Sequence, residues 1–280
     1  MWARYPIWVQ TRKRVSVLLP VFNGQDTLNL AIQSTLRALG NQDELLVFIQ
    51  GPNLDGYRVG EINDERLNVF YQDQAEGIAQ ALNFLGKKAK GEYVARMDQD
   101  DICLKSRFRK QLKVLMRENY DFVFANAVLF GKQIRPFGFM PQLPYRLNSP
   151  TSNLLLAFQN PFVHPTMLAK KSALESLGFF RPCIAEDYDL WLRAASRGFK
   201  LGKMRSYGIF YRVHRGQFSQ TENFNTRVDR DASVSESRKE LITSLINSGQ
   251  VSPTGDLNDQ LIAALKKRQL IFRLQWSAVG

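Results

Sequence analysis

The chain is poor in the residues that build disulfide frameworks and zinc sites. Its 280 residues include two cysteines, Cys103 and Cys183, which lie far apart and lack the close spacing of metal-ligating pairs. A disulfide framework and a structural zinc site are therefore excluded, and we expect both cysteines to be small core residues. Stability must come from an apolar core, for which 44% hydrophobic residues are ample.

Long apolar runs are also missing. No stretch approaches the roughly 18 consecutive apolar residues of a membrane-spanning helix, and the opening MWARYPIWVQTRKR lacks the apolar centre and cleavage site of a signal peptide. We therefore expect a cytoplasmic protein. Residues 257–276 place leucines and aromatic residues on one side of a predicted helix and basic residues elsewhere. This helix either docks onto the main domain or makes peripheral contact with the inner face of the cell membrane.

Acidic residues are scarce relative to basic ones, with 26 Asp and Glu against 38 Lys and Arg and a formal net charge of +12. Such a charge suits a nucleic acid, an anionic membrane surface or an anionic substrate such as a nucleotide sugar. The basic residues are dispersed and are not interleaved with aromatic residues in a recognisable module. We therefore expect no nucleic-acid partner.

Strand and helix patterns alternate along the first hundred residues. Apolar, β-branched runs predict strands at 15–22, 44–49, 67–71 and 92–97, with helices between the first two and at 77–88. This alternation predicts an α/β fold with a mostly parallel sheet flanked by helices. A basic helix at 106–118, a strand at 121–130 and a helix at 186–198 follow. Residues 131–165, rich in proline, are expected to form loops and short pieces around a site.

The segment RMDQDD, residues 96–101, directly follows a predicted strand and places three carboxylates within four residues. Such carboxylates repel one another and lose hydration, unless a cation or a bound partner offsets their charge. Mg²⁺ and Mn²⁺ prefer oxygen ligands, and a short loop after a strand can direct Asp98 and Asp100 to one point. The alternative is a solvated turn that caps the next helix, a role that suits Asp101.

Further segments accompany this cluster in a definite order: VSVLLPVFNG at 15–24, NPFVHPT at 160–166, EDYDLWLR at 186–193 and YRVHRGQFS at 211–219. Over about residues 13–220 the set resembles glycosyltransferase family 2, most closely its bacterial branch for exopolysaccharide and lipopolysaccharide sugars. The resemblance implies a Rossmann-like GT-A domain in 1–220 and leaves 221–280 as a C-terminal helical extension. It also implies a nucleotide-sugar donor, a divalent cation (Mn²⁺ or Mg²⁺) and inversion at the anomeric carbon.

The resemblance assigns the metal site to Asp98 and Asp100, because a cation there neutralises the charge that develops on the leaving diphosphate. Gln99 and Asp101 support these ligands. His214 completes the metal's shell or contacts the diphosphate. A core histidine bonded to a backbone carbonyl is the alternative for His214.

Asp187 is the candidate general base, because an inverting displacement needs one carboxylate to take the proton of the acceptor hydroxyl. Its place at a helix N-terminus favours the ionised form. Asp189 projects about 200° around the helix from Asp187 and cannot share its site. Glu186 is better placed to cap the helix or to support the metal's shell. His164 either lines the acceptor pocket or is structural.

The residues expected to bind the nucleotide sugar lie at the ends of predicted strands: Pro20, Val21, Phe22, Asn23, Gln50, Asp98 and Gln99. The chain departs from the family pattern where the second strand ends, because Ile49 and Gln50 replace a pair of aspartates. The amide of Gln50 can still donate and accept hydrogen bonds to a base. A uridine diphosphate sugar is the default expectation.

The sequence thus predicts a metal-dependent inverting glycosyltransferase of the hexosyltransferase type. Its acceptor is expected to be a hydroxyl of a bacterial surface glycan, lipid-linked during assembly. Two alternatives stay open: a nucleotidyltransferase, which also uses paired carboxylates, and a non-catalytic protein that binds nucleotide sugars. The first usually needs a glycine-rich basic loop near the first strand, which VFNGQDT does not provide. Retention of the carboxylates Asp98, Asp100 and Asp187 argues against the second.

Overall fold

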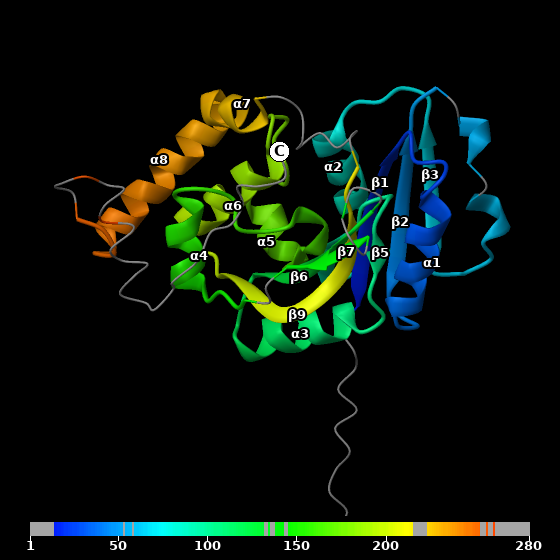
Figure 1. Cartoon of the computed structure of the whole chain (residues 1–280), viewed down its shortest axis with the longest axis horizontal. Coiled ribbons are helices and arrows are strands. Elements are labelled where there is room, and N and C mark those ends of the chain that lie inside the picture. The colour runs from blue at the N-terminus through cyan, green and yellow to red at the C-terminus, as the bar shows by residue number, and fades with distance from the viewer. Residues whose placement is uncertain are drawn as a thin grey trace, which may run out of the picture.

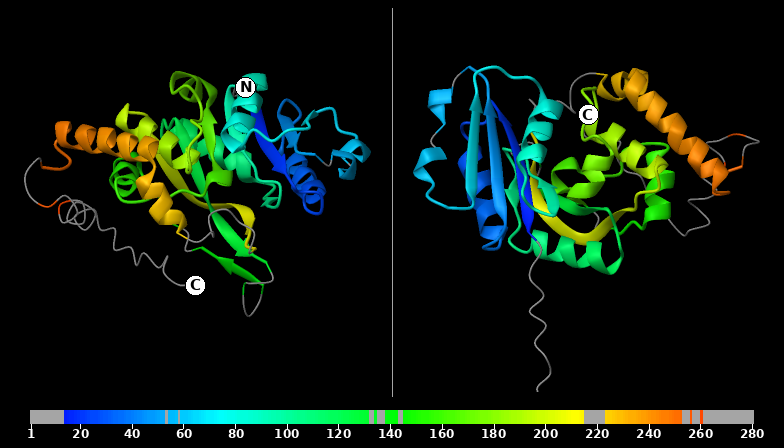
Figure 2. Two further views of the ribbon diagram at one scale, coloured as in Figure 1. Left: turned by 90° about the horizontal axis from the view of Figure 1, so that it is seen from above. Right: turned by 180° about the vertical axis from the view of Figure 1, so that it is seen from behind.

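The computed structural model describes residues 14–52, 54–57, 59–131, 134, 138–142, 145–214, 223–252, 256 and 260. A nine-stranded sheet runs through this part of the chain in the order β3-β2-β1-β4-β8-β6-β9-β5, and β7 pairs with β6 outside that path. The strands are β1 Val15–Phe22, β2 Glu44–Gln50, β3 Leu67–Gln72, β4 Tyr93–Arg96, β5 Ile102–Cys103, β6 Phe122–Phe130, β7 Phe139–Pro141, β8 Leu168–Lys170 and β9 Leu201–Arg212. Helices cover both faces of the sheet (Figures 1 and 2).

The first half of the sheet is parallel, as the alternating sequence pattern predicts. β1 pairs in parallel with β2 and with β4, and β2 pairs in parallel with β3. The connection between the parallel neighbours β1 and β2 needs a crossover, which contains α1 (Leu28–Ala38). The connection from β3 across the sheet to β4 contains α2 (Ile78–Lys88). The carboxyl ends of these strands therefore meet at one edge of the sheet, where open α/β folds bind ligands.

The second half of the sheet is mixed. β8 is antiparallel to both β4 and β6, β9 is parallel to β6, and β5 is antiparallel to β9. The long, curved β9 crosses beneath the helices of this half (Figure 1). The sequence predicts neither β8 nor β9. β8 is three residues long, too short for a periodic pattern, and β9 interrupts its apolar residues with glycine, lysine and arginine.

The sheet separates two hydrophobic cores because side chains alternate between its faces. On one face Leu18, Phe48 and Phe124 pack with side chains of α2 and of the helix α4 (Ser149–Leu156). On the other face Val17, Leu19 and Val47 pack against α1 and α3 (Arg107–Arg117). The predicted helix 106–118 is confirmed, but its Arg107 is fully buried and does not belong to the solvated basic face.

The short pieces expected within residues 131–165 include a strand and a helix. The segment contains β7 and the helix α4, Ser149–Leu156. Proline does not prevent α4, because Pro150 lies at its first turn, where the missing N–H is not needed, and the side chain of Asn148 accepts from Thr151 N at the N-cap. A short 3₁₀ turn, η3 (His164–Thr166), then leads into β8, and α5 (Lys171–Ser176) follows β8.

The helices α7 (Phe224–Arg230) and α8 (Ala232–Asn247) pack against the rest of the described chain. Val234, Leu241 and Leu245 on α8 are buried in the same hydrophobic core as α6 (Glu186–Ser196). The predicted domain boundary near residue 220 lies within residues 215–222, which are outside the described residues. The predicted helix at 257–276 is also outside them, except for Gln260. In the described part of the chain, no helix is long and apolar enough to cross a membrane.

A buried polar contact joins α8 to α6. The hydroxyl of Ser237 donates to Asp189 Oδ1 at 2.7 Å, and Asp189 Oδ2 accepts from Arg193 Nε at 2.8 Å. Arg193 also donates to the backbone oxygens of Leu177 and Phe179, at 2.6 and 2.8 Å. The contact therefore fixes α6 to the elements on either side of it.

Replacing Ser237 with alanine tests this contact. Ser237→Ala leaves a buried carboxylate oxygen short of one donor, which costs on the order of 1–3 kcal/mol. We expect the free energy of unfolding, measured by urea denaturation, to fall by that amount. Ser235→Ala, on a half-buried position of the same helix, is the matched control and is expected to be nearly neutral. Equal free energies for wild type and Ser237→Ala would contradict the role assigned to this contact.

Candidate active site

The acid loop, residues 98–101, follows β4 at the edge where the parallel strands end. The amide of Gln99 holds it against β1, accepting from Phe22 N and donating to Phe22 O, both at 2.7 Å. Gly24 permits this approach, because a Cβ there would lie 2.5 Å from Gln99 Oε1. The Gln99 side chain thus joins the acid loop to β1 by two hydrogen bonds, which fits the supporting role predicted for it.

The pairing of β5 with β9 brings His214 to the acid loop from more than a hundred residues away. Ile102 and Cys103 pair with Phe210 and Ile209, so the end of β9 runs beside the acid loop. There Arg212 N donates to Asp101 Oδ1 at 2.8 Å and Arg212 Nε donates to the backbone oxygen of Asp100 at 2.8 Å.

His214 lies at the mouth of the acid loop. Its Nε2 is 3.0 Å from Asp100 Oδ2, and 45% of its side chain is exposed. The alternative of a core histidine is therefore wrong, and His214 and Asp100 face the same point.

Burial makes the charge of the acid loop costly. It raises the pKa of Asp98 to about 6, against the lowering effect of the Arg96 guanidinium, whose Nη2 is 2.9 Å from Asp98 Oδ1. Burial, reinforced by Asp98 and Asp100, raises the pKa of Asp101 well above its ordinary range. The structure thus confirms the crowding of charge that the sequence indicates.

The acid loop fits a hard divalent cation. Carboxylate oxygens of Asp98, Asp100 and Asp101 lie within 4.8 Å of one another, and Asp101 Oδ2 is buried without a hydrogen-bond partner. Oxygen donors of this kind suit Mg²⁺ or Mn²⁺. Asp98 and Asp100 are the more accessible ligands, because Asp101 is 1% exposed and already accepts from Arg212.

A second group of polar side chains lies where α6 begins. Asp187 Oδ2 accepts from Asn160 Nδ2 at 2.9 Å, and His164 Nδ1 lies 3.9 Å from Asp187 Oδ2 and 3.6 Å from Glu186 Oε1. Burial raises the pKa of Asp187, although Arg96, the Asn160 amide and backbone N–H groups lower it. A carboxylate that is held by hydrogen-bond donors in surroundings that exclude water is a candidate for proton abstraction.

Asp189 points away from Asp187, as the helical geometry predicts. It is fully buried and bonded to Arg193 and Ser237 on the far side of α6. Glu186 does not cap the helix, whose N-cap is Ala185, and lies beside His164 instead.

His164 is 8% exposed and packs against Phe180 and Trp191, with ring centroids 5.5 and 5.7 Å apart. Burial holds its pKa well below the usual range, so the ring is neutral. His164 is therefore a buried neighbour of Glu186 and Asp187 and is not exposed to solvent.

The ends of β1 and β2 form a separate surface beside the acid loop. Phe22 is 52% exposed and pairs in register with Gln50, and its ring approaches Gly51 so closely that a Cβ there would lie 3.3 Å from it. Gln50 is 5% exposed, and its Nε2 is buried without a hydrogen-bond partner. An aromatic ring beside an unpaired amide suits a planar ring that carries hydrogen-bonding groups. Pro20 and Val21 lie within β1, and Asn23 follows it with a φ of 53°.

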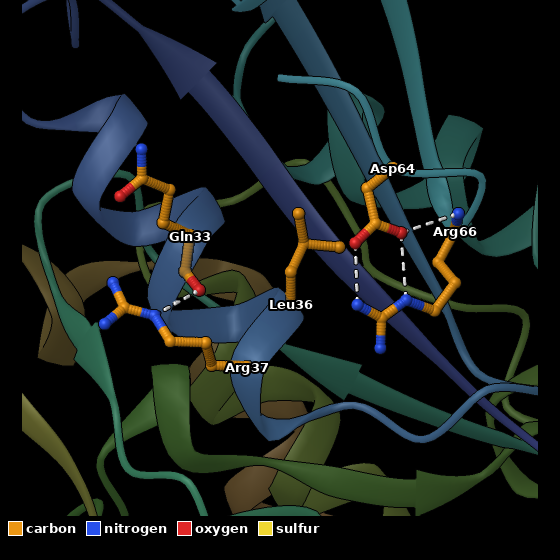
Figure 3. Close-up of a pocket in the computed structure, with 5 residues that line it drawn as sticks. All are labelled: Gln33, Leu36, Arg37, Asp64 and Arg66. Carbon is orange, nitrogen blue, oxygen red and sulfur yellow. Dashed lines mark hydrogen bonds and ion pairs between the residues drawn. The ribbon is translucent and has the colours of Figure 1, made fainter.

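The open pocket in Figure 3 lies elsewhere, between α1 and the segment before β3. Asp64 and Arg66 in it pair with each other, with Arg66 Nη2 2.6 Å from Asp64 Oδ2, and Arg37 Nε donates to the backbone oxygen of Gln33. Because these polar groups satisfy one another, the pocket is not the candidate site.

Three residues of the site escaped the sequence reasoning: Arg96, Asn160 and Arg212. Each belongs to a segment that carries the family resemblance, RMDQDD, NPFVHPT or YRVHRGQFS. The signal was therefore present, but nothing in the sequence tells which polar residue of a segment turns toward a carboxylate.

Solved structures with similar folds identify the architecture. The structure of S. aureus TarS in complex with UDP-GlcNAc superposes with a TM-score of 0.61 over 91% of this chain and 80% of that chain, at 16% identity. The mannosyltransferase PcManGT from Pyrobaculum calidifontis, in complex with GDP-Man and Mn²⁺, gives 0.59 over 94% and 81%, also at 16% identity. The fold is that of the GT-A glycosyltransferases.

Comparison of the sequence with family models identifies the family within this fold class. The family model described as Glycosyl transferase family 2 matches residues 16–178, so the chain belongs to glycosyltransferase family 2. Relatives include the Escherichia coli O-antigen biosynthesis glycosyltransferase WbnJ, 27% identical over 71% of this chain and 80% of the relative. The E. coli UDP-Glc:alpha-D-GlcNAc-diphosphoundecaprenol beta-1,3-glucosyltransferase WfaP is 25% identical over 73% and 79%. The Erwinia amylovora amylovoran biosynthesis glycosyltransferase AmsE is 29% identical over 65% and 70%. The chain is a glycosyltransferase with relatives in polysaccharide biosynthesis.

Thermal stability of the metal-free protein tests the charge at Asp98. Because the pKa of Asp98 is higher in the folded than in the unfolded chain, its contribution favours folding fully below about pH 4 and is lost as pH rises through about 6. An asparagine does not titrate, so the Asp98→Asn variant does not lose this stability as the pH rises. With a chelator present, we expect the variant to melt at a higher temperature than wild type at pH 8, with the difference disappearing toward pH 4.

Added Mn²⁺ should reverse the order at pH 8, raising the Tm of wild type and leaving Asp98→Asn unchanged. Asp229→Asn, whose carboxylate is 61% exposed, should follow wild type throughout. An equal rise in the Tm of wild type and Asp98→Asn would place the cation elsewhere.

Proposed function

We propose that this protein is a metal-dependent inverting glycosyltransferase that moves a sugar from a nucleotide-sugar donor to a hydroxyl of a bacterial surface glycan. The observation that carries the proposal is the pair of carboxylate groups on either side of Arg96: the acid loop after β4 and Asp187 at the start of α6. One group suits a phosphate-bound cation and the other suits proton abstraction. A single displacement requires both.

On the donor side, Asp98 and Asp100 would hold the cation, with His214 beside Asp100. A cation held there would supply positive charge to offset the negative charge of the departing diphosphate. Arg96 keeps Asp98 in place through its guanidinium, and Gln99 holds the acid loop at the end of β1. These contacts preorganise the ligands, so little rearrangement is needed when the donor binds.

On the acceptor side, Asp187 takes the proton of the attacking hydroxyl. The O–H bond breaks toward the Asp187 carboxylate and the oxygen forms a bond to the anomeric carbon. On the opposite face of that carbon the bond to the diphosphate breaks, and the electron pair leaves with the phosphate. Asn160 fixes the orientation of Asp187 by donating to Oδ2. Attack and departure on opposite faces give inversion.

Uridine is the base that we propose for the donor. Phe22 offers a stacking surface, and the buried, unpaired Nε2 of Gln50 needs an acceptor. Uracil presents a carbonyl oxygen beside an N–H, which matches the donor and acceptor of one side-chain amide. TarS, a structural neighbour, was solved with UDP-GlcNAc, although the neighbour PcManGT was solved with GDP-Man.

The acceptor that we propose is lipid-linked. WfaP, a relative, is named for a diphosphoundecaprenol-linked sugar acceptor, and this chain's net charge of +12 suits a substrate that bears phosphates. Cytoplasmic action at the inner face of the membrane would follow from such an acceptor.

Substitution of Asp187 tests the mechanism. Asp187→Asn keeps the size and the contact with Asn160 but cannot accept a proton, so we expect turnover to fall by about 10²–10⁴-fold, the usual contribution of a general base. Donor affinity, measured by calorimetry with UDP and Mn²⁺, should stay within about twofold. Transfer is followed by UDP release from a panel of UDP-sugars, with Asp229→Asn as control. Near-wild-type turnover in Asp187→Asn would remove this residue from the role of base.

Substitution of Gln50 tests the base. Gln50→Glu replaces the amide donor with an acceptor, so it loses one hydrogen bond to a uracil carbonyl, worth on the order of 1–2 kcal/mol. We expect UDP to bind about tenfold more weakly by calorimetry. Gln33→Glu, on the exposed face of α1, is the matched control. If UDP bound to Gln50→Glu as tightly as to wild type, Gln50 would not read the base.

A further inference from the structure

Glu186 lies next to the proposed general base, yet the proposed reaction gives it no task. We infer that Glu186 carries a proton in the working enzyme and serves as a neutral positioning residue, so that Asp187 holds the negative charge of the group formed by His164, Glu186 and Asp187. The inference rests on the proposed function, because it concerns the state of the site in which Asp187 acts.

The geometry makes two charges at this place costly. A nitrogen of His164 and carboxylate oxygens of Glu186 and Asp187 lie within 4.8 Å of one another. Glu186 and His164 are both 8% exposed. Two carboxylates so close together and removed from water do not both ionise readily; one keeps its proton.

His164 does not compensate them. Its neutral ring, which packs against Phe180 and Trp191, brings no positive charge to the carboxylates. Its Nδ1 lies 3.6 Å from Glu186 Oε1, and without a proton-borne charge on the ring this approach forms no ion pair.

The hydrogen bonds decide which carboxylate keeps the proton. Asp187 accepts from the Asn160 amide at 2.9 Å and from the backbone N–H of Tyr188, and both stabilise its ionised form. For Glu186 the corresponding contact is its own backbone N–H. The proton therefore stays on Glu186, and the pair divides into one neutral and one charged group.

The charged and titratable groups that face Glu186 come from several elements: Asp187 on α6, His164 on η3, Arg96 on β4, Asp98 on the acid loop and Cys183 in the segment before α6. Arg96 is the cation among them, and Asp98 already shares it at 2.9 Å. Burial, followed by the charge of Asp187, raises the pKa of Glu186 to about 8. Glu186 thus remains neutral through the neutral range and ionises above it.

Ionisation of Glu186 would add a second negative charge close to Asp98 and to the diphosphate of the donor. Donor binding should weaken as a result, so kcat/KM for the donor should fall above about pH 8 while the base remains ionised. A merely structural Glu186 would not produce this dependence on pH.

The test is the pH profile of kcat/KM for the donor between pH 6 and 10, with Glu186→Gln as the variant. The glutamine keeps the size and the neutral state, so we expect a loss of three- to tenfold at pH 7 and an alkaline decline displaced upward by at least one pH unit. Glu175→Gln, at an exposed glutamate on α5, is the control and should retain the wild-type decline.

Two results would overturn the inference. A decline in Glu186→Gln at the wild-type pH would show that another group titrates, and a loss above a hundredfold at every pH would show that Glu186 works as an anion. Failure of the proposed function is distinguishable from both: wild type would then release no UDP from any donor tested, or Asp187→Asn would turn over normally.

Discussion

The accumulation of negative charge around Arg96 is the constraint on which the site depends. The acid loop brings three carboxylates to the end of β4, and α6 brings Glu186 and Asp187 to the same region, where each raises the pKa of another. Arg96 is 5% exposed and contacts Asp98 directly, while its charge also lowers the pKa of Asp187. One buried guanidinium thus serves both groups and cannot neutralise them all. The remaining charge is available for a cation on one side and for a proton on the other.

A second buried arginine holds this arrangement in position. Arg107 on α3 donates to the backbone oxygens of Arg96 and Met167, at 2.8 and 3.2 Å. One turn later Gln111 donates to the backbone oxygens of Val123 and Thr166, at 3.0 and 2.7 Å. These two side chains join the ends of β4, β6 and η3 from the face of the sheet opposite α6. These bonds hold the acid loop and the turn that carries His164 at a fixed separation, which the proposed mechanism needs.

The sequence predicts the parallel half of the fold well because each strand there is a short apolar run bounded by turn residues. The predicted strand 15–22 coincides with β1, and the helix at 77–88 differs from α2 by one residue. The second half was harder, since β9 buries Lys203 and exposes Arg205 within one strand, a pattern that local periodicity cannot recognise. The candidate site was likewise only partly predictable from the local sequence. Its carboxylates were visible as motifs, whereas contacts such as Asn160 with Asp187 depend on tertiary packing.

At the end of β2, the residues that take the place of the family's aspartates carry no charge. Replacing the family's aspartates by Ile49 and Gln50 removes two carboxylates near an already crowded site, and Ile49 turns into the apolar core with α1. Gln50 remains on the face shared with Phe22, where its amide lacks a partner. Leaving a buried donor unpaired costs free energy, which a base bound as proposed would recover. In the proposed mechanism the base contact can therefore change while the acid loop and Asp187 keep their roles, because a contact from the Gln50 amide adds no charge.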